Sequence, residues 1–397
     1  MARERIWTKV FISLFLTNMA VFLVFYGLVS TLPLYVKGEM GRTDDEAGLL
    51  MSIFLLSAIV VRPFTGILLD RFGKRKMLWI SLFFYLLCTI LYAFIHSFYG
   101  LLLLRFFQGI WFSVATTASG SLATDHVPAQ RRGEGLGYYA MSTNLAIVLG
   151  PFIALFFIQA YSFQVLFYAL SILMAAGSFF ALAIPLQTKH IKDKSMLKIS
   201  LNNLFEKNAV PIALLASLVA FSYSSVLSYL SIYAQQKHLL AWSSTFFVLF
   251  AAVMLLTRPF TGRLYDLKGP KFILIPGFFS FMIGFGLLAF VNSVALFLAS
   301  GVFIGFGYGA IVPSLQTLCV QSALPERSGY ATATYFTFFD IGVAIGSYLL
   351  GLVALKFGYQ HVYLLAGAVI LVVFFIYYFV SDKSKMQLVA ISEAEKS

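Results

Sequence analysis

The sequence predicts an all-α membrane protein with twelve transmembrane helices arranged as two parallel six-helix repeats. Three observations lead to this prediction. The chain of 397 residues is 60% hydrophobic, with a mean hydropathy of +0.89. Its apolar residues gather in twelve long runs, and the second half repeats the pattern of the first at a fixed distance. Only 11% of the residues are charged, and a soluble protein of this length could not keep so much apolar surface out of water.

Each of the twelve apolar runs is long enough to cross a bilayer. A span needs about 20 predominantly apolar residues, and in lipid only helices or closed barrels satisfy the backbone polar groups. The runs are rich in Leu, Phe and Ala without a two-residue alternation, which favours helices. The expected spans are 10–36, 46–67, 77–96, 98–124, 134–158, 161–186, 209–234, 241–262, 272–292, 294–320, 329–354 and 359–380.

The basic residues are distributed unequally between the two sides of the membrane. Of the 28 lysines and arginines, 21 fall in segments on the side of the N-terminus, four fall in the opposite loops, and Arg62, Arg105 and Arg258 fall within spans. The positive-inside rule therefore places both termini in the cytoplasm of a multi-pass protein of the cell membrane. The net charge of +12 then reflects topology and attraction to anionic lipid, and not binding to nucleic acid.

A hydrophilic stretch between the sixth and seventh spans divides the chain into two halves. Within this stretch, four apolar residues recur at helical spacing among lysines, at Leu197, Leu201, Leu204 and Phe205. Both a short helix on the inner membrane face and a solvated basic linker fit this pattern. The predicted organisation is an N-terminal six-helix bundle over 1–186, a cytoplasmic basic linker over 187–208, a C-terminal six-helix bundle over 209–381 and a cytoplasmic tail over 382–397.

One unusual phrase, RPFTG, occurs at residues 62–66 and again at 258–262, 196 positions later. The same offset pairs Gly109 with Gly305, Arg131 with Arg327, Gly133 with Gly329, Asn144 with Asp340 and Gly150 with Gly346. A fixed register over such a distance indicates a duplicated fold. Since each half has an even number of helices, the halves are parallel repeats, and a substrate site is expected near mid-membrane between them.

Three segments give this repeat a family resemblance. Residues 66–78, GILLDRFGKRKML, resemble the loop 2–3 motif of the major facilitator superfamily, and loop 8–9 has a weaker copy. Residues 101–109 resemble its helix 4 motif, although Trp111 and Phe112 depart from the small residues expected there. Gly150-Pro151 resembles the centre of the helix 5 motif of drug:proton antiporters, without the flanking glycines. The resemblance implies the major facilitator fold.

The loop motifs imply a gate between the halves. Its residues are Gly66, Asp70, Arg71, Gly73, Lys74, Arg75 and Asp125 in the first half, and Gly262, Asp266 and Gly269 in the second. The glycines allow tight turns, and each aspartate favours the positive end of a helix. An alternative is that the charges only anchor the loops at lipid headgroups.

The resemblance also assigns partners to these gate residues. Asp70 should meet the start of helix 11 near Ser328 and Gly329, and Asp266 the start of helix 5 near Arg132 and Gly133. Lys74 or Arg75 is expected to pair with Asp125. The second half has Gln321 in the place of Asp125, so this ion pair should have no counterpart there.

Asp340 is the one acidic residue that falls well inside a span. It lies eleven residues past Gly329, roughly 16 Å into a hydrocarbon core about 30 Å thick. Ionisable groups at this depth are costly and mark functional sites. A carboxyl group there can exchange a proton while substrate competes for the site, so we predict that Asp340 couples transport to protons. The alternative is a permanently protonated Asp340 that hydrogen-bonds a neighbouring helix.

Three arginines also lie within spans. Arg105, roughly 8 Å from the outer side, is a candidate to bind an anionic substrate group, to pair with Asp340, to order the cavity or to reach the outer interface. Arg62 and Arg258 lie near cytoplasmic ends and are expected to extend toward them. Asn144, the repeat mate of Asp340 at the same depth on helix 5, is a further substrate-binding candidate. Helices 1, 4, 7 and 10 line the superfamily's cavity, which adds the candidates Asn18, Tyr26, Gln108, Trp111, Tyr223, Tyr308 and Gln316.

Other signals argue against a metal, a cofactor or catalysis. Cys88 and Cys319 lie in apolar runs, and the five histidines form no metal cluster in the sequence. The glycines from 301 to 309 lie inside an apolar helix, which indicates close helix packing and not a nucleotide loop. Because the sequence has no ATP motif, transport would be driven by an ion gradient, with the proton as coupling ion and no other cofactor.

The sequence therefore predicts a proton-coupled secondary transporter that exports a small amphipathic drug or metabolite. It would act as a monomer in contact with lipid, without nucleic acid or metal, and would not be an enzyme. One alternative is uptake or facilitated diffusion of a sugar-like or organic-anion substrate, with Arg105 as the main ligand and Asp340→Asn without effect. Another is a membrane sensor or enzyme that transports nothing.

Overall fold

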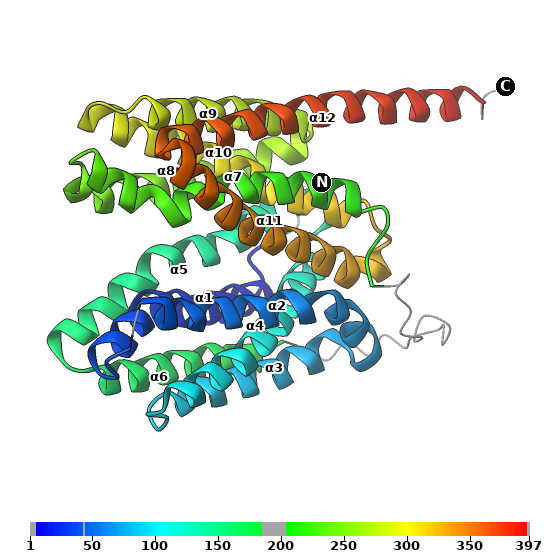
Figure 1. Cartoon of the computed structure of the whole chain (residues 1–397). Helices are drawn as coiled ribbons and strands as arrows, with labels where there is room; N and C mark the ends of the chain where they lie inside the picture. The colour runs from blue at the N-terminus through cyan, green and yellow to red at the C-terminus, as the bar shows by residue number, and fades with distance from the viewer. Residues whose placement is uncertain (1–4, 43, 185–203, 395–397) are drawn as a thin grey trace.

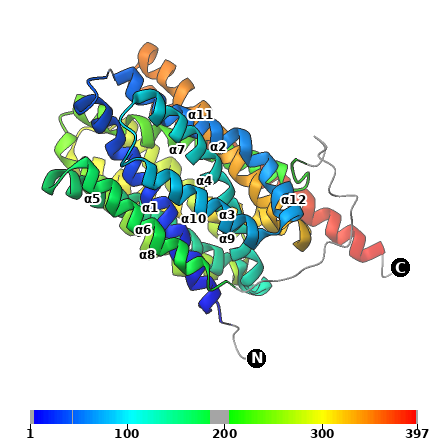
Figure 2. The same ribbon diagram turned by 90° about the horizontal axis from the view of Figure 1, so that it is seen from below.

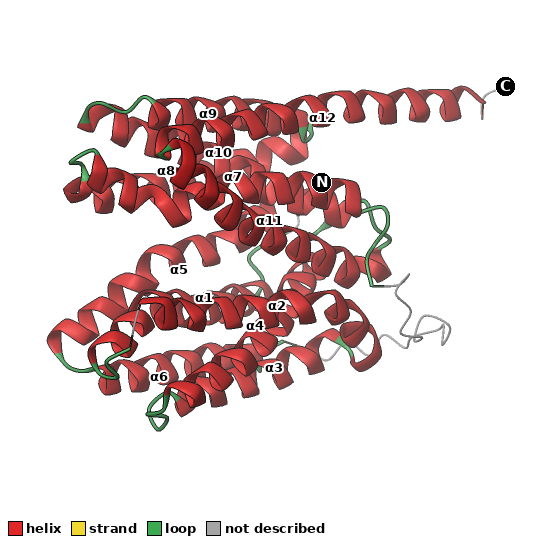
Figure 3. Cartoon of the chain, viewed as in Figure 1, coloured by secondary structure: helices red, strands yellow, loops and turns green. Residues whose placement is uncertain are grey.

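The computed structural model describes residues 5–42, 44–184 and 204–394, and over these residues it contains helices and no strand (Figures 1 and 3). Short 3-10 turns precede α5, α8 and α11. The long helices are α1 (Lys9–Gly38), α2 (Asp44–Phe72), α3 (Lys74–Leu91), α4 (Phe98–His126), α5 (Arg132–Ala160), α6 (Phe163–Ala181), α7 (Val210–Gln236), α8 (Ser243–Lys268), α9 (Lys271–Ala289), α10 (Val294–Gln321), α11 (Ser328–Phe357) and α12 (Tyr359–Ala394).

The twelve predicted helices are all present, and eleven of those described are apolar enough over their length to span a membrane. The exception is α3, whose first turn carries Lys74, Arg75 and Lys76. The ends differ from the prediction by five residues or more in five helices, of which α3 and α6 end earlier than predicted, at Leu91 and Ala181. Both α2 and α8 continue past the expected ends at 67 and 262, and α12 runs past 380 and projects beyond the bundle (Figure 1).

The two halves form two layers, with α1–α6 in one and α7–α12 in the other (Figure 1). Each half has its own apolar core, one built from residues between 6 and 184 and the other from residues between 209 and 377. In the first half α1 packs on α5 and α2 on α4, and in the second α7 packs on α11 and α8 on α10. The predicted linker lies largely outside the described residues.

Repeated glycines set the packing within each half. A Cβ at Gly109 on α4 would collide with the backbone oxygen of Phe54 on α2. A Cβ at Gly305 on α10 would lie 2.5 Å from the backbone oxygen of Phe250 on α8. Phe54 and Phe250 are themselves related by the 196-residue offset, so the two halves use the same close helix contact. This confirms the helix-packing interpretation of the glycines in α10.

The halves meet along two seams, α2 with α11 and α5 with α8, which run along opposite sides of the molecule (Figure 2). We call the end that holds the α2–α3, α4–α5, α8–α9 and α10–α11 connections the basic end. A Cβ at Gly66 would lie 2.8 Å from the Tyr330 ring, and one at Gly262 would lie 2.7 Å from the Glu134 Cα. These glycines therefore let helices of opposite halves touch near the basic end.

The turns at the basic end need glycine for a second reason. Gly73 before α3 and Gly269 before α9 have φ angles of 86° and 88°. Side chains with a Cβ avoid this region of backbone conformation. The predicted tight turns of the two loop motifs are therefore confirmed, and they occur at equivalent places in the two halves.

Candidate functional site

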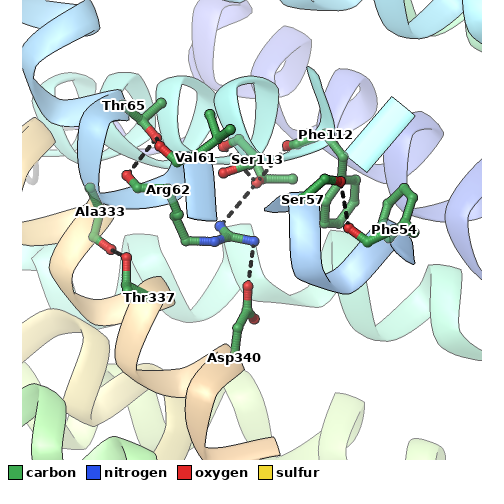
Figure 4. Close-up of polar contacts among 11 residues, drawn as sticks. Phe54, Ser57, Val61, Arg62, Thr65, Phe112, Ser113, Ala333, Thr337 and Asp340 are labelled. Atoms are coloured by element: carbon green, nitrogen blue, oxygen red, sulfur yellow. Dashed lines mark hydrogen bonds and ion pairs between the residues drawn. The ribbon is translucent and has the colours of Figure 1, made fainter. Parts of the chain in front are cut away.

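An ion pair between a buried arginine and a partly exposed aspartate, whose side chain is 20% exposed, joins the two halves in the middle of the bundle. Arg62 Nη2 on α2 lies 2.8 Å from Asp340 Oδ2 on α11 (Figure 4). The Arg62 side chain is 3% exposed. Its Nη1 donates to Thr116 Oγ1 at 3.3 Å, and its guanidinium carbon lies 5.1 Å from the centre of the Phe336 ring. The pair therefore links α2, α4 and α11 at one point.

Two expectations about the arginines are corrected by this pair. Arg62 does not extend to the cytoplasmic side, because α2 continues to Phe72 and leaves Arg62 ten residues, about 15 Å, from the helix end. Asp340 lies twelve residues, about 18 Å, from the start of α11 at Ser328. Arg62 and Asp340 thus lie at similar depths on facing helices, and the Asp340 carboxylate is closer to the Arg62 guanidinium than the cytoplasmic side is. Asp340 thus pairs with Arg62 and not with Arg105.

Arg105 belongs instead to the core of the first half. It is 1% exposed, its Nη1 donates to Gln108 Oε1 at 3.1 Å, and its guanidinium lies 5.1 Å from the centre of the Phe54 ring. The Tyr92 hydroxyl donates to the same Gln108 oxygen at 2.8 Å. Arg105 and Gln108 therefore hold α4 against α2 and the end of α3, and Arg105 Nε and Gln108 Nε2 have no hydrogen-bond partner among the described residues.

Three of the predicted tyrosines lie near one another between the halves. The rings of Tyr223 on α7 and Tyr308 on α10 lie with their centres 4.1 Å apart. Tyr26 on α1 lies within electrostatic range of Tyr308 and, more weakly, of Asp340. The structure therefore brings together aromatic faces and hydroxyl groups from both halves. An amphipathic molecule needs this combination of apolar surface and polar groups.

The two asparagines among the candidates have different surroundings. The Asn18 side-chain amide on α1 donates to Ser142 Oγ at 2.7 Å and to Thr143 Oγ1 at 3.1 Å, which ties α1 to α5 within the first half. Asn144, the repeat mate of Asp340, is 3% exposed, and its Nδ2 has no hydrogen-bond partner among the described residues. Asn144 is therefore a buried donor without an acceptor.

The helix 5 motif also serves to pack α5 on α1. A Cβ at Gly150 would lie 2.9 Å from the Tyr26 Cβ and 3.1 Å from the Leu23 backbone oxygen. Pro151 follows inside the same helix. Gly150 permits a close approach of α5 to α1 and so sets the position of Tyr26. The helix 5 motif therefore supports the tyrosine group from the side of α5.

The α5–α8 seam is held at the basic end by Asp266. Its two carboxylate oxygens accept from the backbone N–H groups of Gly133 and Glu134, each at 2.8 Å. These are free donors at the start of α5, where the helix dipole favours an anion. The predicted meeting of Asp266 with the start of helix 5 is confirmed. This contact closes the basic end on one side.

The α2–α11 seam is held differently. Lys74 Nζ lies 2.6 Å from Asp125 Oδ2 and donates to Ser328 Oγ at 2.7 Å, while Ser328 Oγ donates to Asp125 Oδ1 at 3.0 Å. The predicted Lys74–Asp125 ion pair is confirmed. Asp70 lies beside Tyr330, a residue of the first turn of α11, so the predicted meeting of Asp70 with the start of helix 11 is confirmed, and Asp125 adds a second contact there through Ser328.

The remaining gate residues follow the predicted asymmetry. Gln321, which replaces Asp125 in the second half, accepts from the Tyr265 hydroxyl at 2.9 Å and so makes no ion pair. The Arg71 guanidinium lies over the Phe72 ring at 5.5 Å. Arg75 lies over the Trp79 ring at 4.8 Å and donates to the Leu182 backbone oxygen at 3.4 Å. Arg75 therefore faces α3 and the end of α6.

The family is decided by comparison with known proteins. The family model described as Major Facilitator Superfamily matches residues 14–346 and 244–396. The chain belongs to the major facilitator superfamily. Its fold is therefore that of a family of membrane-embedded transporters, as the sequence predicts.

Individual members of the superfamily match to different extents. An uncharacterised MFS-type transporter of Methanocaldococcus jannaschii, MJ1560, is 28% identical over 85% of this chain and 89% of its own length. The quinolone resistance protein NorA of Staphylococcus aureus is 30% identical over 35% of this chain and 36% of its own length. The crystal structure of the human organic anion transporter MFSD10 (TETRAN) has a TM-score of 0.78 at 17% identity, over 92% of this chain and 98% of that one, which shows a shared fold.

Sequence reasoning missed one further contact at the superfamily gate. Glu206, treated as a loop residue, forms an ion pair with Arg327, and its backbone N–H donates to Thr334 Oγ1 at 3.0 Å. Leu204 is buried against Ile67 and Tyr330. The apolar pair Leu204–Phe205 before Glu206 was the available signal. The start of the second half is thus attached to the α2–α11 seam.

Proposed function

We propose that this chain is a proton-coupled efflux carrier, a secondary transporter that exchanges protons for a small amphipathic molecule by alternating access. The Arg62–Asp340 ion pair is the observation that carries the proposal. It is the contact between the halves that a single proton can abolish, and it lies at the depth where superfamily members and other repeat transporters bind their ligands.

The ion pair links the protonation of one group to the position of two helices. While Asp340 is ionised, its attraction to Arg62 holds α11 on α2, and the buried site strengthens that attraction. A proton on Asp340 removes the charge and leaves Arg62 with Thr116 and the Phe336 ring. The seam then loses its central contact, so protonation favours separation of the halves at the basic end. Proton binding and conformation are thereby coupled, and the coupling is reciprocal.

The orientation of the carrier follows from charge. We propose that it lies in the cell membrane with both termini in the cytoplasm, because 21 of the 28 lysines and arginines fall on the side of the N-terminus. The basic end is then the cytoplasmic gate, and the conformation described here has this gate closed. A proton that arrives from outside would open the gate inward, and its release inside would let Arg62 and Asp340 close the gate behind the cargo.

The aromatic group between the halves supports an amphipathic cargo. Tyr223 and Tyr308 offer two ring faces that are tilted by 33° to each other, and Tyr26 contributes a third ring from the opposite half. Rings of this kind cover apolar bodies without demanding one shape. The similarity to a quinolone resistance protein, which covers 35% of this chain, also supports export over uptake.

The experiment uses inside-out membrane vesicles with an imposed pH gradient, reported by a quenched dye. Lipophilic cations, neutral drugs, aromatic carboxylates and sugars are added in turn to vesicles with the native protein or with Asp340→Asn. We expect at least one compound to collapse the gradient with the native protein and not with the variant. Exchange of labelled compound without a gradient should persist in Asp340→Asn, which controls for loss of folding.

Two results would overturn the proposal. If compounds move across the membrane while the pH gradient stays constant, the carrier is a facilitator. If Asp340→Asn collapses the gradient as the native protein does, Asp340 has a structural role alone. Arg62→Gln provides an independent check, because it removes the partner and leaves the carboxyl in place. It should retain gradient-free exchange and lose accumulation against a gradient.

A further inference from the structure

The two halves carry the same arginine but give it different partners. Arg258 on α8 stands 196 residues after Arg62 on α2, and Asp340 on α11 stands 196 residues after Asn144 on α5. Since α5 packs on α8 as α11 packs on α2, we infer from the repeat that Asn144 faces Arg258, although no hydrogen bond joins the two side chains among the described residues. The α2–α11 seam thus has an arginine with a carboxylate. The α5–α8 seam has an arginine with a neutral amide.

Arg258 is a buried charge without compensation. Its side chain is among the largest fully buried ones, and its Nε and Nη1 have no hydrogen-bond partner in the part of the chain that the structure describes. The ionisable groups within electrostatic range of Arg258 are the hydroxyls of Tyr308 and Tyr335, which are neutral near pH 7. An uncompensated charge inside a membrane protein is costly and marks a functional group.

The unpartnered atoms at this seam are all donors. Arg258 contributes Nε and Nη1, and Asn144 contributes Nδ2. Positively charged donors without a partner favour a ligand that accepts hydrogen bonds and carries a negative charge. An anion has both properties. A carboxylate also fits the planar donor pair of a guanidinium in two-point contact, which an isolated water molecule does not.

A small cavity adjoins the guanidinium. Its volume is about 10 Å³, and its walls include Arg258 and the hydroxyl side chains of Thr261, Ser314 and Thr317. A space of this size is at the lower limit for one water molecule, so an anionic head would widen it on binding, and the body of a larger molecule would lie outside it. Tyr308 lies within electrostatic range of both Arg258 and Tyr26. A bound molecule could therefore place its body beside the tyrosines and its head at Arg258.

We propose that Arg258, together with Asn144, binds a monovalent anionic group between the halves. The chemistry is that of a carboxylate on an amphipathic substrate or of a free halide. The inference deepens the proposed transport function and rests on it for the view that the ligand is cargo. It differs from the sequence prediction, which gave the anion-binding role to Arg105, a residue that the structure places in the core of the first half.

The test measures binding to the purified full chain in lipid nanodiscs at pH 7, with gluconate as the bulk anion. Sodium benzoate, neutral benzamide and sodium chloride are titrated by calorimetry and by thermal stability. We expect benzoate to bind saturably and to raise the melting temperature, and benzamide to do neither. Arg258→Gln should weaken benzoate binding at least tenfold. Competition between benzoate and chloride identifies the occupant, since a halide site favours chloride and a substrate site favours benzoate.

The repeat supplies a variant that is expected to fold. Asn144→Asp places a carboxylate opposite Arg258 and copies the Arg62–Asp340 pair of the other seam. It should keep or raise the melting temperature and lose benzoate and chloride binding, whereas Asn144→Ala should bind within a fewfold of the native protein. Equal benzoate affinity in Asn144→Asp and the native protein would overturn the proposal. Equal affinity for benzamide and benzoate would do the same.

The binding result is separable from the proton-coupling result. The titration needs no gradient and no transport, and Asp340→Asn should retain benzoate binding because Asp340 lies on the other seam. A chain that binds benzoate through Arg258 but does not dissipate a pH gradient would keep the anion site and refute proton coupling. A chain that dissipates the gradient with neutral or cationic compounds but does not bind an anion would keep proton coupling and refute the anion site.

Discussion

Replacement of Asp266 by asparagine should open the basic end of the molecule. The carboxylate accepts two backbone hydrogen bonds at 2.8 Å from the start of α5, and asparagine retains one acceptor while it turns an N–H toward the second donor. A hydrogen bond to a charged group contributes about 1.5–3 kcal/mol. Because Asp266 is partly exposed, we expect the lower part of that range. One such bond, about 1.5–2 kcal/mol, corresponds to a 10-fold to 30-fold shift in the ratio of closed to open molecules.

Spin-label distance measurements can observe this shift directly. Cysteines at Phe72 and Leu267, exposed residues at the basic ends of α2 and α8, would carry the labels after replacement of Cys88 and Cys319. The native protein should show one short distance between the labels. The Asp266→Asn variant should add a longer population.

The repeat again offers a matched control, because Asp70 is the equivalent residue in the first half. Asp70 lies beside Tyr330, while Asp125 and Lys74 hold the start of α11 through Ser328. Asp70→Asn should therefore shift the closed population much less than Asp266→Asn does. An unchanged distance distribution in Asp266→Asn would refute the reasoning. So would a control variant that opens the basic end equally.

Three further outcomes follow from the same contacts. Arg105→Gln should lower the free energy of unfolding in detergent by about 2–3 kcal/mol, the scale of its hydrogen bond to Gln108, and leave the KM for substrate unchanged. Gly262→Ala should lower the closed population in the spin-label assay, because its Cβ would meet the α5 backbone, whereas Gly48→Ala meets no described atom within 4 Å and should have no effect. Lys74→Met breaks a partly exposed ion pair and should shift the same equilibrium about fivefold, or about 1 kcal/mol.

Most of the fold could be predicted because its signals are local and duplicated. Apolar runs of about 20 residues identify membrane helices without reference to the rest of the chain. The 196-residue register then relates α2 to α8 and α5 to α11, and the glycines at 66 and 262 do make equivalent contacts in the structure. The amphipathic pattern of Leu197 and Leu201 lies outside the described residues and remains a prediction.

The partner of Asp340 was missed because helix ends are not marked by hydropathy. The α2 helix continues through Asp70 and Arg71, polar residues that end an apolar run without ending a helix. The predicted end at residue 67 was five residues short, and five residues correspond to about 8 Å along a helix. This error made Arg62 appear close to the membrane surface. The same error at α8 concealed Arg258.

For some site residues the role could be predicted from depth in the membrane, and for others it depends on the direction in which the side chain points. Asp340 could be found because depth alone makes a carboxyl in a span exceptional. Depth could not separate Tyr26 and Tyr308, which lie near each other between the halves, from Gln108, which turns into the core of the first half. The direction in which a side chain points from its helix is set by packing on neighbouring helices. When a helix is apolar on all sides, its sequence pattern does not indicate that direction.

The differences between the two halves explain how a symmetric scaffold can respond to one proton. Both seams use the same glycines, but the α2–α11 seam adds one ion pair between the halves, Arg62–Asp340, and the hydrogen bonds of Lys74 and Asp125 to Ser328. At the equivalent positions the α5–α8 seam has Asn144 and Gln321, which do not titrate, and depends on Asp266 at a helix start. A proton on Asp340 therefore weakens one seam and leaves the other in place. Under the proposed mechanism the halves would begin to separate along α2 and α11, and an anion at Arg258 would act on the other seam, α5–α8.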